Sequence, residues 1–324
     1  MNLHLLSRAF REARLLMFGC ALTMFGFCMI RVWIVGQVDM SRFQGILEIL
    51  RPEVERLSSV SFEQLITYPG RVAITYNEPM VIILMLVWTI ARGSAAVSGQ
   101  LSIGTLEMLL AQPISRVQWL LSNAIITVFG VMLIASSGWA GIYVGVETTS
   151  VKIEKKPITL TLPLFNIDVP LPFTTDDDSP DRAPLSDFVD VSIYVPSALN
   201  LMGLGLFFAG VTTLMSSWDR YRWRTIGIVS GFMVIQMILR VLSLSIEGQE
   251  WLAYFTILTW YEPEVLATYA VHEPDTLWTF LFENRAGESG YGAFAYLGWL
   301  LLGCVTSYAT AFWLFKTRDL PAPI

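Results

Sequence analysis

Six apolar runs alternate with polar segments along the chain. Each run is close to the roughly 20 residues that an α-helix needs to cross a bilayer. The pattern predicts an all-α polytopic membrane protein with six transmembrane helices, at residues 15–35, 79–97, 119–146, 196–218, 225–243 and 293–315. The first run lacks a clear small-residue cleavage site, so we expect an uncleaved span.

Residues 1–14, ahead of the first run, are basic and amphipathic. On a helix, one side would carry apolar side chains and the other side three arginines. These two sets are Leu3, Leu6, Phe10 and Ala13 against Arg8, Arg11 and Arg14. The pattern is typical of a helix that lies on a membrane surface. The alternative is the basic start of a signal peptide.

Polar segments at 37–77, 146–195 and 245–292 separate the runs on one side of the predicted membrane. Within the second of these, residues 157–170 alternate apolar and polar positions between prolines, which predicts a small β-hairpin of edge strands. Within the third, Trp251–Trp260 is aromatic but too short to span, which predicts a re-entrant or interfacial segment. The acidic run at 176–178 has no calcium-loop spacing, so we expect no metal site.

The segment 98–118, between the second and third runs, is the most distinctive part of the chain. It is polar enough to leave the bilayer, yet its apolar residues recur every three or four positions, which predicts a helix with one apolar face. These residues are Leu106, Leu109, Leu110, Ile114, Val117 and Leu121. Pro113 interrupts the pattern, so we expect two short helices that meet there. The plainest interpretation is an ordinary amphipathic connector.

This segment resembles the signature of ABC-2-type permeases, which are the membrane subunits of one class of ABC exporter. The matching residues are Gly104, Thr105, Leu106, Glu107, Leu109, Leu110, Pro113, Ser115 and Arg116. The family often has an acidic residue four positions before the glycine, where this chain has Gln100. The resemblance implies that the segment lies in the cytosol and carries a coupling helix that docks on an ATPase subunit.

The resemblance also assigns roles within the segment. We expect Leu106, Leu109 and Leu110 to insert into a groove on the ATPase, with Gly104 opening the helix and Pro113 ending it. Glu107 either contacts a helix terminus or the ATPase, or it is a solvated charge or a local partner of Arg116. Arg116 itself would reach lipid phosphates or the ATPase. A chain with six spans forms half of a pathway in this family, so a homodimer or a paired permease is implied.

Composition agrees with a membrane protein. Of the 324 residues, 54% are hydrophobic and only 15% are charged, and the mean hydropathy is +0.56. The net charge of −6 gives no reason to expect nucleic acid. The sequence has no phosphate-binding loop and no zinc-protease motif. We therefore expect no enzyme activity and no bound cofactor in this chain, with ATP and magnesium on a partner subunit.

Basic residues favour one side of the predicted membrane. The N-terminal segment, the 92–118 and 219–224 links and the 317–324 tail lie on that side or at the span ends that face it. They carry Arg8, Arg11, Arg14, Arg92, Arg116, Arg220, Arg222, Arg224, Lys316 and Arg318. Because lysine and arginine mark the cytosolic side, the bias predicts cytosolic termini and, by resemblance, a bacterial plasma membrane location.

The predicted function is therefore a permease domain over 15–316 that couples ATP hydrolysis on a separate subunit to export. One alternative is a membrane interaction or sensory protein with the same topology. Another is an ion-driven carrier, which would need paired ionisable groups within the membrane. The spans have only Arg31 and Arg240, both near span ends, so we rank the carrier last.

Overall fold

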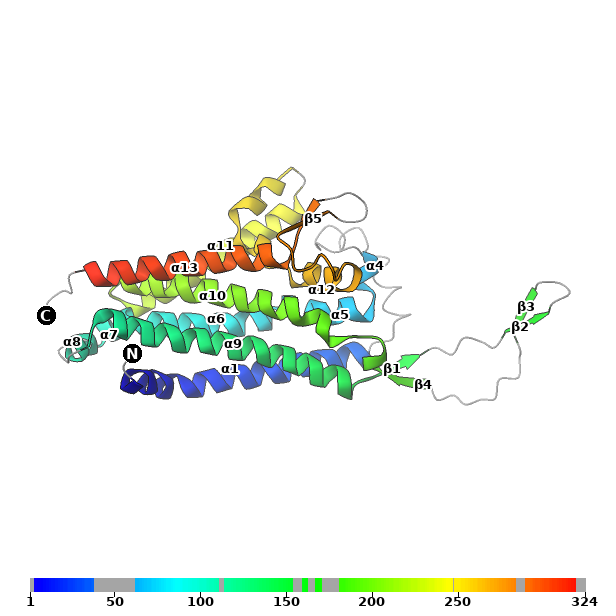
Figure 1. Ribbon diagram of the computed structural model, residues 1–324, viewed down its shortest axis with the longest axis horizontal. Coiled ribbons are helices and arrows are strands. Elements are labelled where there is room, and N and C mark those ends of the chain that lie inside the picture. Colours follow the sequence, from blue (N-terminus) through cyan, green and yellow to red (C-terminus); the bar gives the residue numbers. More distant parts are fainter. Residues whose placement is uncertain are drawn as a thin grey trace.

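The computed structural model describes residues 3–37, 62–110, 114–153, 159–162, 167–170, 181–246, 248–283 and 289–318. Within them, six helical segments are long and apolar enough to cross a membrane, and they lie side by side in one elongated bundle (Figure 1). They are α1 (Leu3–Gln37), Tyr68–Ala96 with α6 (Pro79–Ala96), α9 (Arg116–Thr148), Val191–Trp218 with α10 (Val195–Trp218), α11 (Arg222–Ser245) and α13 (Ala293–Thr317). The six predicted helices are thus present, and the chain has the character of a multi-pass membrane protein.

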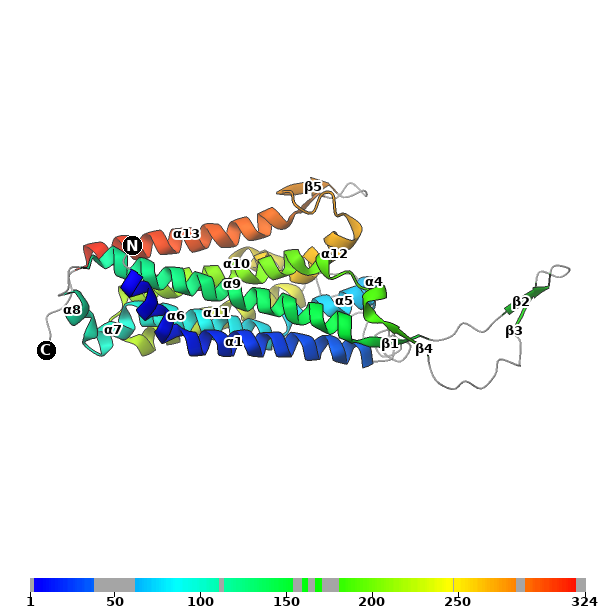
Figure 2. The same ribbon diagram turned by 60° about the horizontal axis from the view of Figure 1, so that its bottom comes forward.

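Helix α1 continues without a break through the predicted boundary between residues 14 and 15. Figure 2 shows its first turns, in dark blue, leaning away from the axis of the rest of the helix. The buried stripe of these turns is Leu5, Ala9 and Ala13, whereas Leu3 is 71% exposed. The helix thus packs on its own bundle through Leu5, Ala9 and Ala13, and the predicted contact of Leu3 with the membrane surface stays a prediction.

Small residues bring the long helices into close contact. A Cβ atom on Gly130 of α9 would lie 2.0 Å from the ring of Trp88 on α6, so only glycine leaves room for this indole. The indole nitrogen of Trp88 donates a hydrogen bond to the Thr127 carbonyl oxygen at 2.9 Å. Gly93 on α6 meets Thr212 on α10 in the same way. These contacts are of the small-residue kind that holds helices together in a bilayer.

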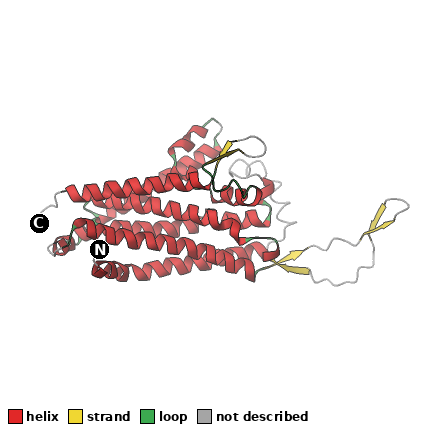
Figure 3. Ribbon diagram, in the orientation of Figure 1, coloured by secondary structure: helices red, strands yellow, loops and turns green. Residues whose placement is uncertain are grey.

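The two ends of the bundle differ. Helix α1 begins and α13 ends at one of them, which also holds α7 and α8 (Figure 1). We call it the basic end, after Arg8, Arg116, Arg222 and Arg318. The opposite end, which we call the far end, holds short helices and every strand in Figure 3.

Short elements build the far end. Its helical pieces are α4 (Phe62–Leu65), α5 (Tyr68–Ala73), η1 (Ile74–Asn77), η2 (Leu185–Asp187), η3 (Val191–Tyr194), η4 (Glu250–Phe255), η5 (Ile257–Trp260) and α12 (Pro263–His272). Its strands pair antiparallel as β1 (Ser150–Ile153) with β4 (Asp181–Pro184), β2 (Thr159–Leu162) with β3 (Ile167–Pro170), and β5 (Leu281–Glu283) with β6 (Ser289–Tyr291). The β2–β3 pair is the predicted hairpin, and the other two pairs were not predicted.

The aromatic segment 251–260 forms the two short helices η4 and η5 rather than a span. It is tied to α11 through Gln236, which is buried. The side-chain oxygen of Gln236 accepts a hydrogen bond from the Ile257 amide at 2.7 Å, and its carbonyl oxygen accepts one from the Thr256 hydroxyl at 3.1 Å. Gln236 therefore fixes this segment to the bundle.

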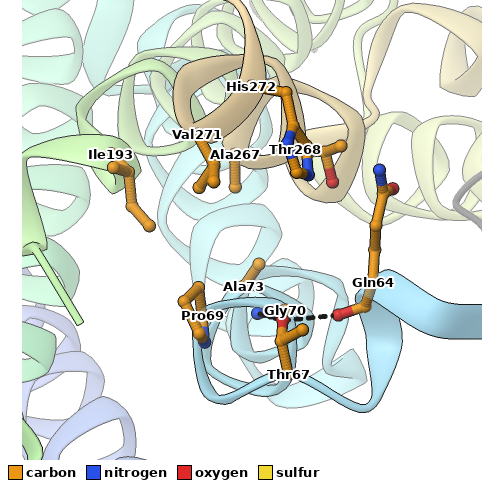
Figure 4. Close-up of a pocket in the computed structure, with 10 residues that line it drawn as sticks. All are labelled: Gln64, Thr67, Pro69, Gly70, Ala73, Ile193, Ala267, Thr268, Val271 and His272. Carbon is orange, nitrogen blue, oxygen red and sulfur yellow. Dashed lines mark hydrogen bonds between the residues drawn. The ribbon is translucent and has the colours of Figure 1, made fainter. Parts of the chain in front are cut away.

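A pocket of about 210 Å³ opens between α5 and α12 at the far end (Figure 4). Pro69, Ala73 and Ala267 give it mainly apolar walls. Thr67 caps α5 beside it, because its hydroxyl accepts a hydrogen bond from the Gly70 amide and donates one to the Gln64 carbonyl oxygen. The Thr67 hydroxyl beside the pocket is thus engaged in local structure.

Candidate functional site: the elbow between α6 and α9

The chain leaves α6 through two short helices, α7 (Ser98–Ser102) and α8 (Thr105–Leu110), before α9 begins. We call residues 97–110 the elbow; Figures 1 and 2 show it at the basic end of the bundle. The backbone leaves the helical conformation at Val97, and Gly104 has a φ of +71°. Gly104 directly precedes α8, as predicted for a residue that opens this helix.

Helices α7 and α8 meet at Ile103 and Gly104, a break that was not predicted. A positive φ is unfavourable for residues with a Cβ atom, and this explains glycine at the turn. Pro113 lies outside the described residues, so its predicted role in ending the second helix stays a prediction.

Buried hydroxyl groups hold the start of the elbow to α10 and α11. The Ser216 hydroxyl of α10 accepts hydrogen bonds from the amides of Val97 and Ser98, at 3.2 and 2.9 Å. The Thr225 hydroxyl of α11 donates to the Ser98 hydroxyl at 3.1 Å. Ser98, Ser216 and Thr225 are all fully buried. A displacement of α7 would therefore break buried hydrogen bonds unless α10 and α11 moved with it.

Helix α9 holds the elbow from the other side. The indole nitrogen of Trp119 donates a hydrogen bond to the Ala96 carbonyl oxygen at 2.8 Å, which satisfies a carbonyl at the end of α6. Trp119 is buried in a small apolar cluster of the basic end together with Leu5, Ala96, Val97, Leu106, Leu120, Ala311 and Phe315. This cluster joins α1, α6, α9 and α13 beneath the elbow.

The two short helices are tied to each other through Gln100. The Thr105 hydroxyl donates to the Gln100 side-chain oxygen at 2.6 Å and also lies 3.3 Å from its carbonyl oxygen. A carboxylate at position 100 would accept the same hydrogen bond. Gln100, which stands in place of the acidic residue of the signature, thus keeps an acceptor for Thr105 and lacks only the negative charge.

One residue of the predicted outward face of α8 is buried instead. Leu106 is fully buried in the cluster beneath the elbow, so the expectation that it inserts into a partner was wrong. Ile103 and Met108 instead point outward, with 68% and 74% of their surface exposed. The repeat of apolar residues identified an amphipathic helix but not which face the bundle would cover. The side chains of Glu107, Leu109 and Leu110 lie outside the described residues.

The end of the signature is the start of a helix. The Ser115 hydroxyl accepts a hydrogen bond from the Gln118 amide at 3.2 Å, and the Gln118 side-chain oxygen accepts one from the Ser115 amide at 3.3 Å. This reciprocal pair is a capping box that fixes the first turn of α9.

Arg116 contacts backbone carbonyl groups at the end of a neighbouring helix. Its guanidinium donates to the carbonyl oxygens of Phe315 and Arg318 at the end of α13, at 3.3 and 2.6 Å. Arg318 in turn donates to the carbonyl oxygens of Ser217 and Asp219 after α10, at 2.9 and 3.3 Å. Cations stabilise the negative ends of helices in this way. Two arginines therefore join the ends of α9, α13 and α10.

The other predicted basic residues divide into paired and exposed groups. Arg8 forms an ion pair with Glu12 at 2.9 Å and lies over the Trp119 ring, whereas Arg11 and Arg14 are exposed. Arg224 lies 3.4 Å from the buried carboxylate of Asp219.

Two arginines near the elbow differ in their surroundings. Arg222 is exposed and reaches the Ser94 hydroxyl and the Ala91 carbonyl oxygen over 3.3 and 3.4 Å, while Arg220 is half-buried. Arg92, in contrast, is buried at 6% exposure and donates to the Asn123 side-chain oxygen at 3.1 Å. The charge count had assigned Arg92 to the cytosolic side of the membrane, and no local signal in the sequence reveals its burial.

Metal binding and thiol chemistry have little support among the described residues. Within the described residues, no three His, Cys, Asp or Glu side chains gather as a metal site would require. Cys20, Cys28 and Cys304 are buried free thiols. The acidic run at 176–178 lies outside the described residues. No protein-family model matches the chain, and no curated protein does.

Proposed function

We propose that this chain is the membrane-spanning permease subunit of an ABC exporter of the ABC-2 type, driven by a separate ATPase subunit. The observation that carries the proposal is the elbow. A segment that resembles the coupling signature forms two short helices at one end of a six-helix bundle, beyond the ends of α6 and α9. It is anchored to several helices yet exposes Ile103 and Met108.

The anchoring supports a mechanical role for the elbow. Force applied to α8 passes through the Gln100–Thr105 hydrogen bond to α7, and from α7 through Ser98 to Ser216 and Thr225. A connector that served only to join two helices would not require buried hydrogen bonds to two further helices. In the proposed cycle, closure of the ATPase subunits pushes α8, and α6, α10 and α11 shift together.

The proposed orientation puts the basic end in the cytosol, with both termini there, in a bacterial plasma membrane. The arginines at this end support it, because basic residues concentrate on the cytosolic side of membrane proteins. Helix α8 is then within reach of a cytosolic ATPase, which would carry ATP and magnesium. A homodimer or a paired permease completes the pathway in this proposal.

Co-purification tests the proposal. The full chain, tagged at the C-terminus, is extracted from its native membrane in mild detergent, and the proteins that accompany it are identified by mass spectrometry. We expect a stoichiometric subunit with a phosphate-binding loop and ATP hydrolysis in the purified complex. Recovery of the intact chain with partners but without any ATPase would favour the alternative of a membrane interaction or sensory protein.

A further inference from the structure

A long apolar groove runs between α6 and α11 on the outside of the bundle. Its volume is about 570 Å³. Its lining residues, apart from Arg222 and Ser230, are apolar, and they include Ile83, Val87, Val234 and Met237. These four side chains are 43% to 55% exposed, so no other part of the described structure covers the groove.

The groove has a charged mouth at the basic end. Arg222, at the first turn of α11, lines it there. Its guanidinium has five N–H donors, and the two hydrogen bonds that it makes, to Ser94 and Ala91, are long at 3.3 and 3.4 Å. Donors therefore remain for an anion at the mouth.

The surroundings of Arg222 are basic and aromatic. Residues 219–224 contain three arginines and one acidic residue, Asp219, which is buried and pairs with Arg224. Trp218, just before this turn, and Trp223, within it, are 60% and 73% exposed. Exposed tryptophan beside arginine is typical of the level of lipid headgroups. The local excess of positive charge favours an anionic headgroup over a neutral one.

The dimensions of the groove fit one leaflet. From Arg222 to Met233 the helix rises about 16 Å at about 1.5 Å per residue, close to the roughly 15 Å of half the hydrocarbon core. A headgroup at Arg222 would therefore place an acyl chain along the apolar wall as far as Met233. A free phosphate would leave that wall unused.

We propose that the α6–α11 groove binds one anionic phospholipid, with its phosphate on Arg222 and an acyl chain between α6 and α11. The site does not depend on the proposed export function, since it needs only a bilayer around the helices. Because Arg222 also contacts Ser94 and lies one turn from Thr225, the bound lipid would stabilise the helix ends to which the elbow is anchored.

Native mass spectrometry of the full chain tests this site. Delipidated protein in detergent is titrated with phosphatidylglycerol and with phosphatidylcholine of the same acyl chains. We expect one phosphatidylglycerol to bind more tightly than phosphatidylcholine. The change Arg222→Gln should weaken phosphatidylglycerol about tenfold, which is about 1.4 kcal/mol. Arg11→Gln, the same change on exposed α1 at the same end, should leave it unchanged.

A second variant probes the apolar wall. Ser230→Trp fills the middle of the groove and should remove binding of both lipids, whereas Leu22→Trp on the exposed side of α1 should not. If Arg222→Gln does not fold, Arg222→Lys and Ser230→Trp still decide the question.

Three outcomes would overturn the proposal. The first is equal affinity for the two lipids. The second is an equal loss of phosphatidylglycerol in Arg222→Gln and Arg11→Gln. The third is a change from dimer to monomer in Ser230→Trp without loss of lipid, which would mean that a second copy of the chain covers the groove.

Discussion

The proposed coupling is most directly tested at the two exposed apolar side chains of the elbow. Ile103 and Met108 are 68% and 74% exposed. Complete burial of such a side chain contributes about 1.5–3 kcal/mol, and about two thirds to three quarters of this remains available at these two positions. Binding of a partner over both side chains would therefore gain about 2–4 kcal/mol from them.

The double change Ile103→Asp and Met108→Asp should remove that gain. Converted to affinity, the loss corresponds to about a 30- to 700-fold rise in the Kd for the ATPase subunit. Stability of the permease alone should change little, because substitutions at exposed positions usually stay within about 0.5 kcal/mol. The assay is ATPase binding to the purified chain in nanodiscs, with thermal unfolding measured on the same sample.

Two matched variants separate docking from folding. Leu106→Ala, in the same helix but fully buried, should cost about 2–5 kcal/mol of unfolding free energy. Val271→Asp, at the 44%-exposed position on α12 of the far end, should change neither quantity. Undiminished ATPase affinity in the double aspartate variant would refute docking through these two residues of the elbow.

Three further changes test the structural reasoning. Gly104→Ala should lower the unfolding free energy by about 1–2 kcal/mol, because alanine is unfavourable at a φ of +71°, and thermal unfolding would show it. Arg116→Gln should cost about 1.5–3 kcal/mol by leaving the end of α13 without its charged donor, while Arg14→Gln, at an exposed arginine, should cost far less in the same measurement. Burial raises the pKa of Glu264, and the charge of Glu262 raises it further. The hydrogen bond from Asn77 lowers this pKa but does not cancel the rise. The folded state therefore loses stability as pH rises above the usual glutamate value of 4.5. Glu264→Gln, which keeps an acceptor for Asn77, should be the more stable protein at neutral pH and lose that advantage below pH 4; a gap independent of pH would contradict this cause.

The long helices were predictable because their signal is local. An apolar run of sufficient length has few alternatives to a spanning helix, and α6, α10 and α13 begin and end within two residues of their predicted bounds. The β2–β3 hairpin was predictable for a similar reason, since its strands follow one another closely. The β1–β4 pair joins Ser150–Ile153 to Asp181–Pro184 across a long insertion, and no local pattern specifies that pairing.

The elbow was predictable in its place but not in its contacts. Spacing alone identified an amphipathic α8, yet the bundle covers Leu106 and leaves Met108 outside, which depends on α1, α9 and α13. Arg116 binds the carbonyl oxygens at the end of α13, a contact that was not predicted, while its predicted contact with lipid or a partner stays a prediction. Such contacts depend on which helix ends lie side by side, and this is decided by tertiary packing.

Site-specific photo-crosslinking from position 108 tests the central claim most directly. A photoreactive amino acid is incorporated in place of Met108 in living cells, and a second strain carries it in place of Val271 at the far end. After irradiation, the crosslinked proteins are identified by mass spectrometry. The proposed function predicts an adduct between position 108 and an ABC ATPase subunit, with none from position 271. Efficient crosslinking from position 108 to lipid or to other proteins, with no ATPase adduct, would contradict the claim that the elbow couples this chain to an ATPase.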